Sequence, residues 1–153
     1  MFVIIGGLFL VLAVLDMGIK QYIEDTFQQN EERETVVPKI VLRKVHNKGL
    51  FLNSLEQYPA FIKAESAVAG ICVLLYDVWV FLHKGNLCKK IGMAFVSAGA
   101  LSNIYDRLIR GKVIDYIGVK CKNKFLSRVT ANLADLYVVL GAFLVAIAKC
   151  FRK

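Results

Sequence analysis

Four long apolar segments in a chain of only 153 residues constrain the fold more than any other feature. They cover about residues 2–23, 64–82, 91–107 and 129–148. Hydrophobic residues make up 57% of the sequence, which is more than a soluble domain of this length normally contains. A helix needs roughly 20 residues to cross a hydrocarbon layer of about 30 Å, and only the third segment is short for this. The segments predict four transmembrane helices in one domain over residues 1–153, rather than a soluble protein with buried helices.

The first segment could instead be a signal peptide that is removed. It lacks a basic start, because no Lys or Arg precedes Lys20, and no Ala-x-Ala cleavage site follows it. Asp16 and Lys20 are one helical turn apart, a spacing that favours an ion pair on a retained helix. We therefore expect an uncleaved span.

The longest polar stretch lies between the first two spans. After Pro38, the apolar residues Ile40, Leu42 and Val45 alternate roughly with basic residues, a pattern typical of an amphipathic strand. The expected fold is an all-α membrane protein of four transmembrane helices. A small membrane-lying β-sheet, formed by the loop at about residues 36–58, would complete it.

The charge and the cysteines exclude several classes of function. The net charge of +8 fits anionic lipid headgroups better than nucleic acid, because no basic stretch carries interleaved aromatic residues. The four cysteines have no CxxC spacing and there are only two histidines, so we expect no disulfide framework, no metal site and no cofactor.

The distribution of Lys and Arg leaves the orientation open. With four spans, both termini and residues 83–90 share one side, which holds six of the 20 Lys and Arg. A plain count would place the other side in the cytoplasm, but short loops weigh most in that rule.

Acid and amide side chains gather where the apolar segments end. A carboxylate beside membrane hydrocarbon is costly and therefore indicates a functional site. On helices, Asn103 would share a face with Asp106 and Arg107, and Asn132 with Asp135. The full group at this edge is Asp16, Lys20, Asn103, Asp106, Arg107, Asp115, Asn132 and Asp135. Asp77 lies toward the opposite side, and we assign it no function.

Two facing carboxylates can hydrolyse a peptide without a metal ion. They share one proton, because both cannot be ionised cheaply. The ionised carboxylate takes a proton from water, and the protonated one polarises the carbonyl group and later protonates the leaving amine. Spacing leaves open which two of Asp106, Asp115 and Asp135 form the pair. Asp106 with Arg107 is typical of a structural pair, although Arg107 could also bind a substrate carbonyl or phosphate group.

Five motifs in sequence order resemble those of the lipoprotein signal peptidase family, also called signal peptidase II. Together they extend over nearly the whole chain. The motifs are Asp16-x-x-x-Lys20, Asn47-Lys-Gly49, Gly99-Ala-Leu-Ser102-Asn103-Ile-Tyr-Asp106-Arg107, Val113-Ile-Asp115-Tyr116 and Asn132-Leu-Ala134-Asp135.

The resemblance implies a multi-pass aspartyl endopeptidase of the bacterial cytoplasmic membrane. Its termini would be cytoplasmic and its active site near the extracytoplasmic face. It would act as a monomer among membrane lipids and cut diacylglyceryl-modified prolipoproteins before the lipidated cysteine. The catalytic residues it implies are Asp115 and Asp135. The substrate-binding residues it implies are Asn47, Gly49, Asn103, Arg107, Asn132 and Ala134, and the structural ones are Asp16, Lys20 and Asp106.

The chain departs from the family pattern mainly in its apolar residues. Leu50-Phe51-Leu52 stands where the family usually has Ala-Ala-Phe, Ser102 replaces a glycine and Ala131 a phenylalanine. These changes mark a divergent member and bear on substrate preference more than on chemistry. One alternative is a non-catalytic lipoprotein-binding or regulatory paralogue. Another is an ion or proton carrier, which would distribute its acids through the depth of the membrane.

Overall fold

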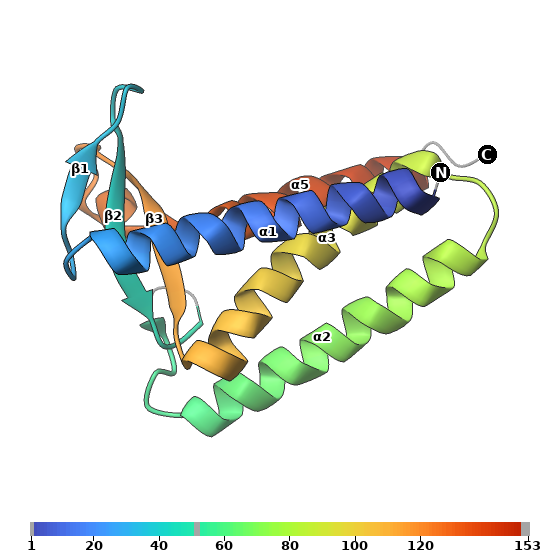
Figure 1. Cartoon of the computed structure of the whole chain (residues 1–153), viewed down its shortest axis with the longest axis horizontal. Coiled ribbons are helices and arrows are strands. Elements are labelled where there is room, and N and C mark those ends of the chain that lie inside the picture. The colour runs from blue at the N-terminus through green and yellow to red at the C-terminus, as the bar shows by residue number, and fades with distance from the viewer. Residues whose placement is uncertain (1, 51–52, 151–153) are drawn as a thin grey trace.

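The computed structural model is mostly helical and describes residues 2–50 and 53–150. Figure 1 shows long helices with a small sheet at one end, whereas α1 begins and α5 ends at the other. The elements in order are α1 (Phe2–Thr26), β1 (Glu32–Glu34), β2 (Ile40–Asn47), α2 (Pro59–Leu82), α3 (Leu87–Tyr105), the π-helical turn η2 (Asp106–Arg110), β3 (Val113–Val119), α4 (Lys124–Arg128), β4 (Thr130–Ala131) and α5 (Leu133–Cys150).

Three helices, α1, α2 and α5, are long and apolar enough to cross a membrane. The fourth predicted span corresponds to α3, which contacts all three of them and stays a prediction as a membrane span. Two helices begin at other residues than the spans predicted for them. Helix α2 begins earlier than residue 64, at Pro59, because proline is well suited to the first turn of a helix. Helix α5 begins later than residue 129, at Leu133, because the residues before it are extended.

Small residues allow α3 and α5 to approach closely. A Cβ atom at Gly99 would overlap the carbonyl oxygen of Ala134, and one at Gly141 would overlap that of Gly92. Close backbone contact of this kind is a common way for helices to pack in membranes, where burial of apolar area gives little driving force. The contact brings the end of α3 against the start of α5, where the acid and amide residues lie.

The sheet has four antiparallel strands in the order β1-β2-β3-β4. The prediction of a sheet from about residues 36–58 is therefore only partly right: β3 and β4 come from the chain between α3 and α5, and β1 begins before residue 36. Strand β3 was missed because lysines flank it, although its Val113–Val119 sequence is rich in β-branched residues. Val45 lies opposite Asp115 in the register of β2 and β3, beyond an irregularity that follows Leu42.

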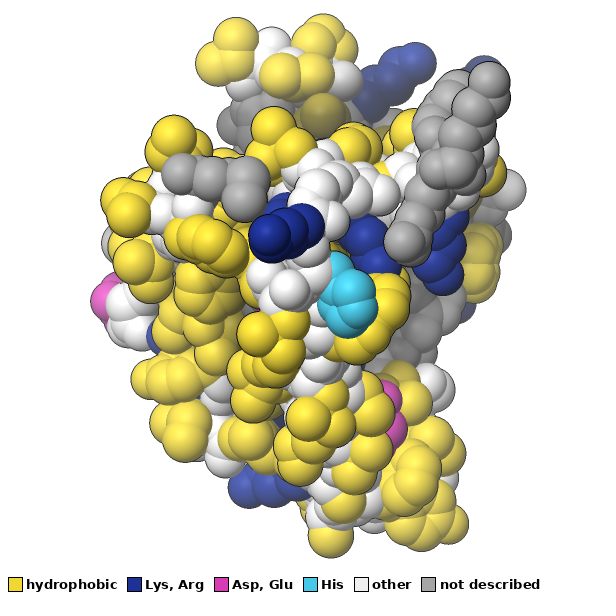
Figure 2. All heavy atoms as spheres, turned by 90° about the vertical axis from the view of Figure 1, so that its right-hand side faces the viewer, with side chains coloured by type: hydrophobic (Ala, Val, Ile, Leu, Met, Phe, Trp, Pro, Cys, Tyr) yellow, Lys and Arg dark blue, Asp and Glu magenta, His cyan; other side chains and the backbone are white. Residues whose placement is uncertain are grey.

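The core that joins sheet to helices is small. Ile23 and Phe27 near the end of α1 pack with Ile114 and Tyr116 of β3. Elsewhere the long helices expose large apolar side chains, among them Leu74, Leu75 and Phe143, each more than 60% accessible. Figure 2 shows apolar side chains over much of the face at the helix ends remote from the sheet. A surface of this composition matches hydrocarbon rather than water.

Candidate active site

Asp115 lies in the middle of β3 with only 5% of its surface exposed. Its two oxygens accept hydrogen bonds from two amides. The Asn47 Nδ2 donates to Oδ2 at 3.2 Å, and the Asn132 Nδ2 donates to Oδ1 at 2.8 Å. Because Asn47 ends β2 and Asn132 precedes α5, the sheet and the helix both orient this carboxylate.

Asp135 lies in the first turn of α5 and makes a reciprocal cap with Asn132. The Asp135 backbone N–H donates to the Asn132 Oδ1 at 2.9 Å, and the Asn132 N–H donates to the Asp135 Oδ2 at 3.1 Å. This is the geometry of a capping box. The prediction that both residues share a helical face is wrong, because Asn132 is the residue before the helix. The cap nevertheless brings them together.

Two amides connect the two carboxylates, the buried Asn132 and the half-buried Asn103. The Asn132 Nδ2 that contacts Asp115 also donates to the Asn103 Oδ1 at 3.2 Å. The Asn103 Nδ2 in turn donates to the Asp135 Oδ1 at 2.8 Å. Four of the predicted site residues therefore form one continuous hydrogen-bonded chain, contributed by α3, β3 and the start of α5.

The environment of Asp115 favours its neutral form. Burial raises the pKa of Asp115 to about 6, and the negative charge of Asp135 raises it as well. Hydrogen bonds from Asn47 and Asn132 and the charge of Lys20 oppose this shift. Since desolvation and a like charge both disfavour ionisation, Asp115 keeps its proton to a higher pH than an ordinary aspartate does.

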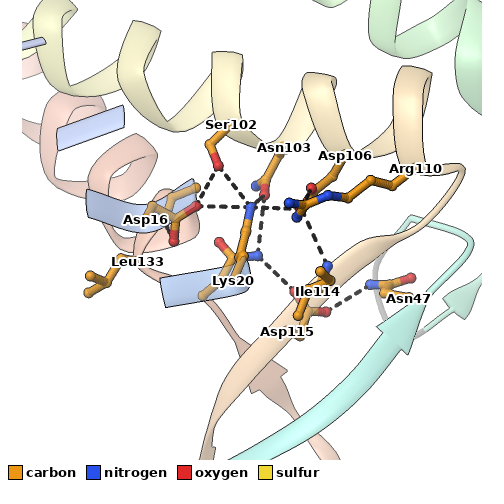
Figure 3. Close-up of polar contacts among 12 residues, drawn as sticks. Asp16, Lys20, Asn47, Ser102, Asn103, Asp106, Arg110, Ile114, Asp115 and Leu133 are labelled. Atoms are coloured by element: carbon orange, nitrogen blue, oxygen red, sulfur yellow. Dashed lines mark hydrogen bonds and ion pairs between the residues drawn. The ribbon is translucent and has the colours of Figure 1, made fainter. Parts of the chain in front are cut away.

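A buried ion cluster is connected to the two carboxylates through Asn103. Lys20 is fully buried, with its Nζ 2.9 Å from the Asp16 Oδ2 and 3.1 Å from the Asp106 Oδ2. The same Nζ donates to the Ser102 Oγ at 3.0 Å and to the Asn103 Oδ1 at 2.8 Å. Figure 3 shows the Lys20 side chain reaching from α1 between these partners. Lys20 therefore links the ion cluster to an amide that holds Asp135.

Asp106 does not form the expected pair with Arg107. Its partners are Lys20 and Arg110, whose Nη1 lies 2.9 Å from the Asp106 Oδ1. The π-helical turn places Asp106 toward the buried cluster, and Arg107 lines a cavity instead. Sequence reasoning missed Arg110, although the i,i+4 spacing from Asp106 could have indicated it.

Tyr116 and Ser102 are two further buried contributors whose roles the motifs did not indicate. The Tyr116 hydroxyl donates to the Asp16 Oδ1 at 2.8 Å and accepts from the Leu133 N–H at 3.1 Å. The Ser102 hydroxyl donates to the Asp16 Oδ2 at 2.5 Å. Both therefore join α1 to a neighbouring element through Asp16.

A cavity of about 770 Å³ opens in front of the carboxylates. Among the described residues, Arg107 contributes a buried Nε without a hydrogen-bond acceptor. Leu50 also lines the cavity, whereas Phe51 and Leu52 lie outside the described residues. Residues from the sheet, α3, η2, α4, α5 and the segments that connect them line it: Val45, His46, Asn47, Leu50, Asn53, Asn103, Arg107, Val113, Asp115, Phe125, Arg128, Val129, Thr130, Ala131 and Asp135.

Three predicted substrate-binding residues are not part of the cavity lining. Asn132 is completely buried behind the carboxylates. Gly49 forms part of a turn in which its N–H donates to the Asn47 Oδ1 at 3.1 Å. Ala134 is buried, and its N–H donates to the Asp16 Oδ1 at 3.2 Å. These positions hold other site residues in place.

The arrangement supplies two carboxylates, a guanidinium group and several amides around an open volume. Within residues 2–50 and 53–150, no three His, Cys, Asp or Glu side chains cluster as they would to hold a metal ion. The groups that face the cavity can transfer protons through Asp115 and Asp135 and can bind polar substrate atoms through Arg107 and Asn47.

Comparison with known proteins gives a consistent result. The family model described as Signal peptidase (SPase) II matches residues 8–151. A lipoprotein signal peptidase of Sinorhizobium fredii is 32% identical over 133 residues, which cover 87% of this chain and 78% of that protein. One of Brucella ovis is 29% identical over 140 residues, covering 91% and 85%.

A solved structure described as a bacterial membrane enzyme has the same fold, with a TM-score of 0.79 at 23% identity. The match covers 94% of this chain and 85% of the other.

Proposed function

The chain belongs to the signal peptidase II family, as its five motifs predicted, and we propose that it is an aspartyl endopeptidase that processes prolipoproteins. Its substrate would be a precursor that carries diacylglycerol on a cysteine, and cleavage would occur just before that cysteine. One observation carries the aspartyl mechanism: Asp115 and Asp135 both face the 770 Å³ cavity and are connected through Asn103 and Asn132.

In the proposed mechanism, a water molecule lies between the two carboxylates. The ionised carboxylate takes a proton from the water, whose oxygen attacks the scissile carbonyl carbon. The protonated carboxylate donates its proton to the carbonyl oxygen as the tetrahedral intermediate forms. The carboxylate that took a proton from water then passes it to the leaving amine as the C–N bond breaks, and the other carboxylate takes a proton back from a hydroxyl group of the intermediate. The pKa of Asp115, raised to about 6 by burial and by Asp135, supports Asp115 as the proton donor.

The cavity wall would bind the lipidated peptide. Arg107 can donate several hydrogen bonds to carbonyl or phosphate oxygens, and its Nε has no acceptor among the described residues. Phe125 and Leu50 offer apolar surface for lipid chains or small side chains. Asn103 and Asn132 would act by positioning the carboxylates, rather than by binding substrate as the family resemblance implies for them.

The molecule would span the membrane four times, with α3 as the fourth helix. Its contacts with α1, α2 and α5 account for its lower apolar content, since much of it faces protein. The sheet would lie at the extracytoplasmic membrane surface, and both termini would be cytoplasmic. Val36 and Val37, exposed in the turn between β1 and β2, would contact lipid there. The predicted monomer stays a prediction.

The proposal is tested by substituting each carboxylate in the full-length protein. Asp115→Asn or Asp135→Asn should lower the rate of processing of a diacylated precursor by at least about 100-fold, as expected when an acid or base is lost. A gel shift of the precursor measures this. Asp25→Asn is the matched control, because Asp25 is exposed near the end of α1. Unchanged processing by either site variant would refute the mechanism. Precursor binding without cleavage by the unaltered protein would favour the non-catalytic alternative.

A further inference from the structure

A second cavity, of about 440 Å³, lies at the opposite end of the helices from the carboxylates. It forms where α2 ends, α3 begins and α5 ends, at the right of Figure 1. The lining contains two lysines and no acid: Trp79, Val80, His83, Lys84, Gly85, Asn86, Cys88, Lys89, Ile147 and Ala148.

This end of the molecule carries positive charge that acidic residues do not balance. Residues 78–105 contain Lys84, Lys89 and Lys90 but no Asp or Glu, and residues 136–153 contain Lys149 and likewise no acid. Asp77, just before the first range, lines a different cavity. In the part of the chain that the structure describes, none of these four lysines takes part in a salt bridge. The cavity therefore opens in a region of positive potential, which attracts anions.

One of the cavity lysines is held in a fixed position. The Lys89 Nζ lies 4.1 Å from the centroid of the Trp79 ring and 5.0 Å from that of Tyr76, and Lys89 is 7% exposed. Trp79 is in turn packed against His83, with ring centroids 4.6 Å apart. Cation–π contacts orient the ammonium group, but they do not neutralise it. A largely buried charge without a counter-ion is costly, so an external anion would stabilise this site.

The rest of the lining is apolar, which indicates an amphipathic ligand. Val80, Ile147 and Ala148 provide the apolar wall, and Leu82 and Leu87 beside it are 78% and 53% exposed. Figure 2 shows basic side chains among apolar ones on this face. The cavity also lies at the ends of two candidate membrane helices, α2 and α5, where lipid headgroups meet hydrocarbon. Basic pockets between helix ends are known to suit anionic headgroups.

We propose that this cavity binds an anionic phospholipid, with the phosphate group at Lys84 and Lys89 and the glycerol and first acyl carbons on the apolar wall. The site is remote from the carboxylates and does not depend on the proposed peptidase activity. It requires only that the helix ends lie at a membrane surface.

Trp79 makes the proposal directly testable, because it is the one tryptophan of the sequence. The purified full-length protein in neutral detergent is titrated with phosphatidylglycerol, phosphatidylcholine or inorganic phosphate while tryptophan fluorescence is recorded. We expect a saturable change with phosphatidylglycerol, binding at least about tenfold weaker with phosphatidylcholine, and no saturation by inorganic phosphate at the same concentrations. Equal responses to the two lipids would refute the proposal. Saturation by inorganic phosphate would indicate a free-anion site and would refute it as well.

A pair of lysine variants distinguishes a site from general attraction. Lys84 is exposed and lines the cavity, whereas Lys149 is exposed at the same end and does not. Lys84→Gln should raise the dissociation constant for phosphatidylglycerol about fivefold, and Lys84→Arg should restore it. Lys149→Gln should leave it within about twofold, since long-range charge is screened by salt. Equal weakening by Lys84→Gln and Lys149→Gln would overturn the assignment of the cavity.

Discussion

The fully buried Lys20 is the position where one substitution should destabilise the protein most. In the native cluster the charges of Asp16 and Asp106 are balanced by Lys20 and Arg110. Lys20→Met removes one positive charge and leaves Asp16 with neutral hydrogen-bond donors alone among the described residues. Removing one partner of a buried ion pair costs about 3–5 kcal/mol, because the other charge stays buried without compensation. We expect Lys20→Met to lower the free energy of unfolding by this amount.

The measurement is the free energy of unfolding of the purified protein in mixed micelles, obtained by titration with a denaturing detergent and followed by circular dichroism. Lys63→Met is the matched control, because Lys63 is exposed on α2 and no salt bridge is found for it among the described residues. We expect the control to change the free energy of unfolding by less than about 0.5 kcal/mol, as is usual for surface positions.

A double variant tests the stated cause. Asp16→Asn, added to Lys20→Met, removes the unpaired charge. The new amide can still accept from Tyr116 and the Ala134 N–H, and it can donate to the Ser102 hydroxyl. Neutral replacement of a buried ion pair is often tolerated, so the double variant should regain at least about 2 kcal/mol of the loss. A double variant no more stable than Lys20→Met, or a loss below about 1 kcal/mol in Lys20→Met itself, would refute the reasoning.

Two further predictions concern chemistry and packing. Because Asp115 must carry a proton, the processing rate should fall as pH rises through its pKa of about 6. Asn47→Ala, which removes a hydrogen bond that lowers this pKa, should move the fall to higher pH. An unmoved pH profile would contradict this role. Gly141→Ala should lower the free energy of unfolding by about 1–3 kcal/mol, because its Cβ would meet the backbone of Gly92. Gly7→Ala, where the space is open, should not lower it; equal losses would contradict the packing argument.

Hydropathy predicted the helices well because lipid-facing side chains must be apolar whatever the helix packs against. Leu74 and Leu75, for example, are exposed on α2 and are apolar all the same. Hydropathy alone did not indicate where helix α5 begins. Val129 extends the apolar segment in sequence, but Asn132 ends the extended stretch and caps the helix. A local hydrogen bond fixed that boundary, and hydropathy does not include it.

The residues of the candidate site could be picked out from the sequence, whereas their contacts could not. The acids and amides stood out because polar groups beside apolar segments are rare. Their partners depend on tertiary geometry, which one sequence does not contain. Asp106 has Arg107 as its neighbour in sequence, yet it pairs with Lys20 of another helix and with Arg110. Strand β3 brings Asp115 to the amides, and its alignment with β2 could not be read from the spacing of motifs.

The contacts also separate the four acids at this edge into two kinds. Asp16 and Asp106 form ion pairs with the cations Lys20 and Arg110. Their hydrogen bonds and ion pairs join helices, which is a structural role. Asp115 and Asp135 instead accept hydrogen bonds from neutral amides.

An amide orients a carboxylate through directional hydrogen bonds, yet its neutral dipole offsets much less of the cost of burying a charge than a cation does. A proton can then move on and off Asp115 at moderate pH, as its raised pKa indicates. Proton transfer is therefore expected from the amide-bound pair and not from the cation-bound pair. Asp115 and Asp135 thus differ from the other two acids in the chemistry of their hydrogen-bond donors, and the pH profile of Asn47→Ala tests the expected proton transfer independently of the loss of either carboxylate.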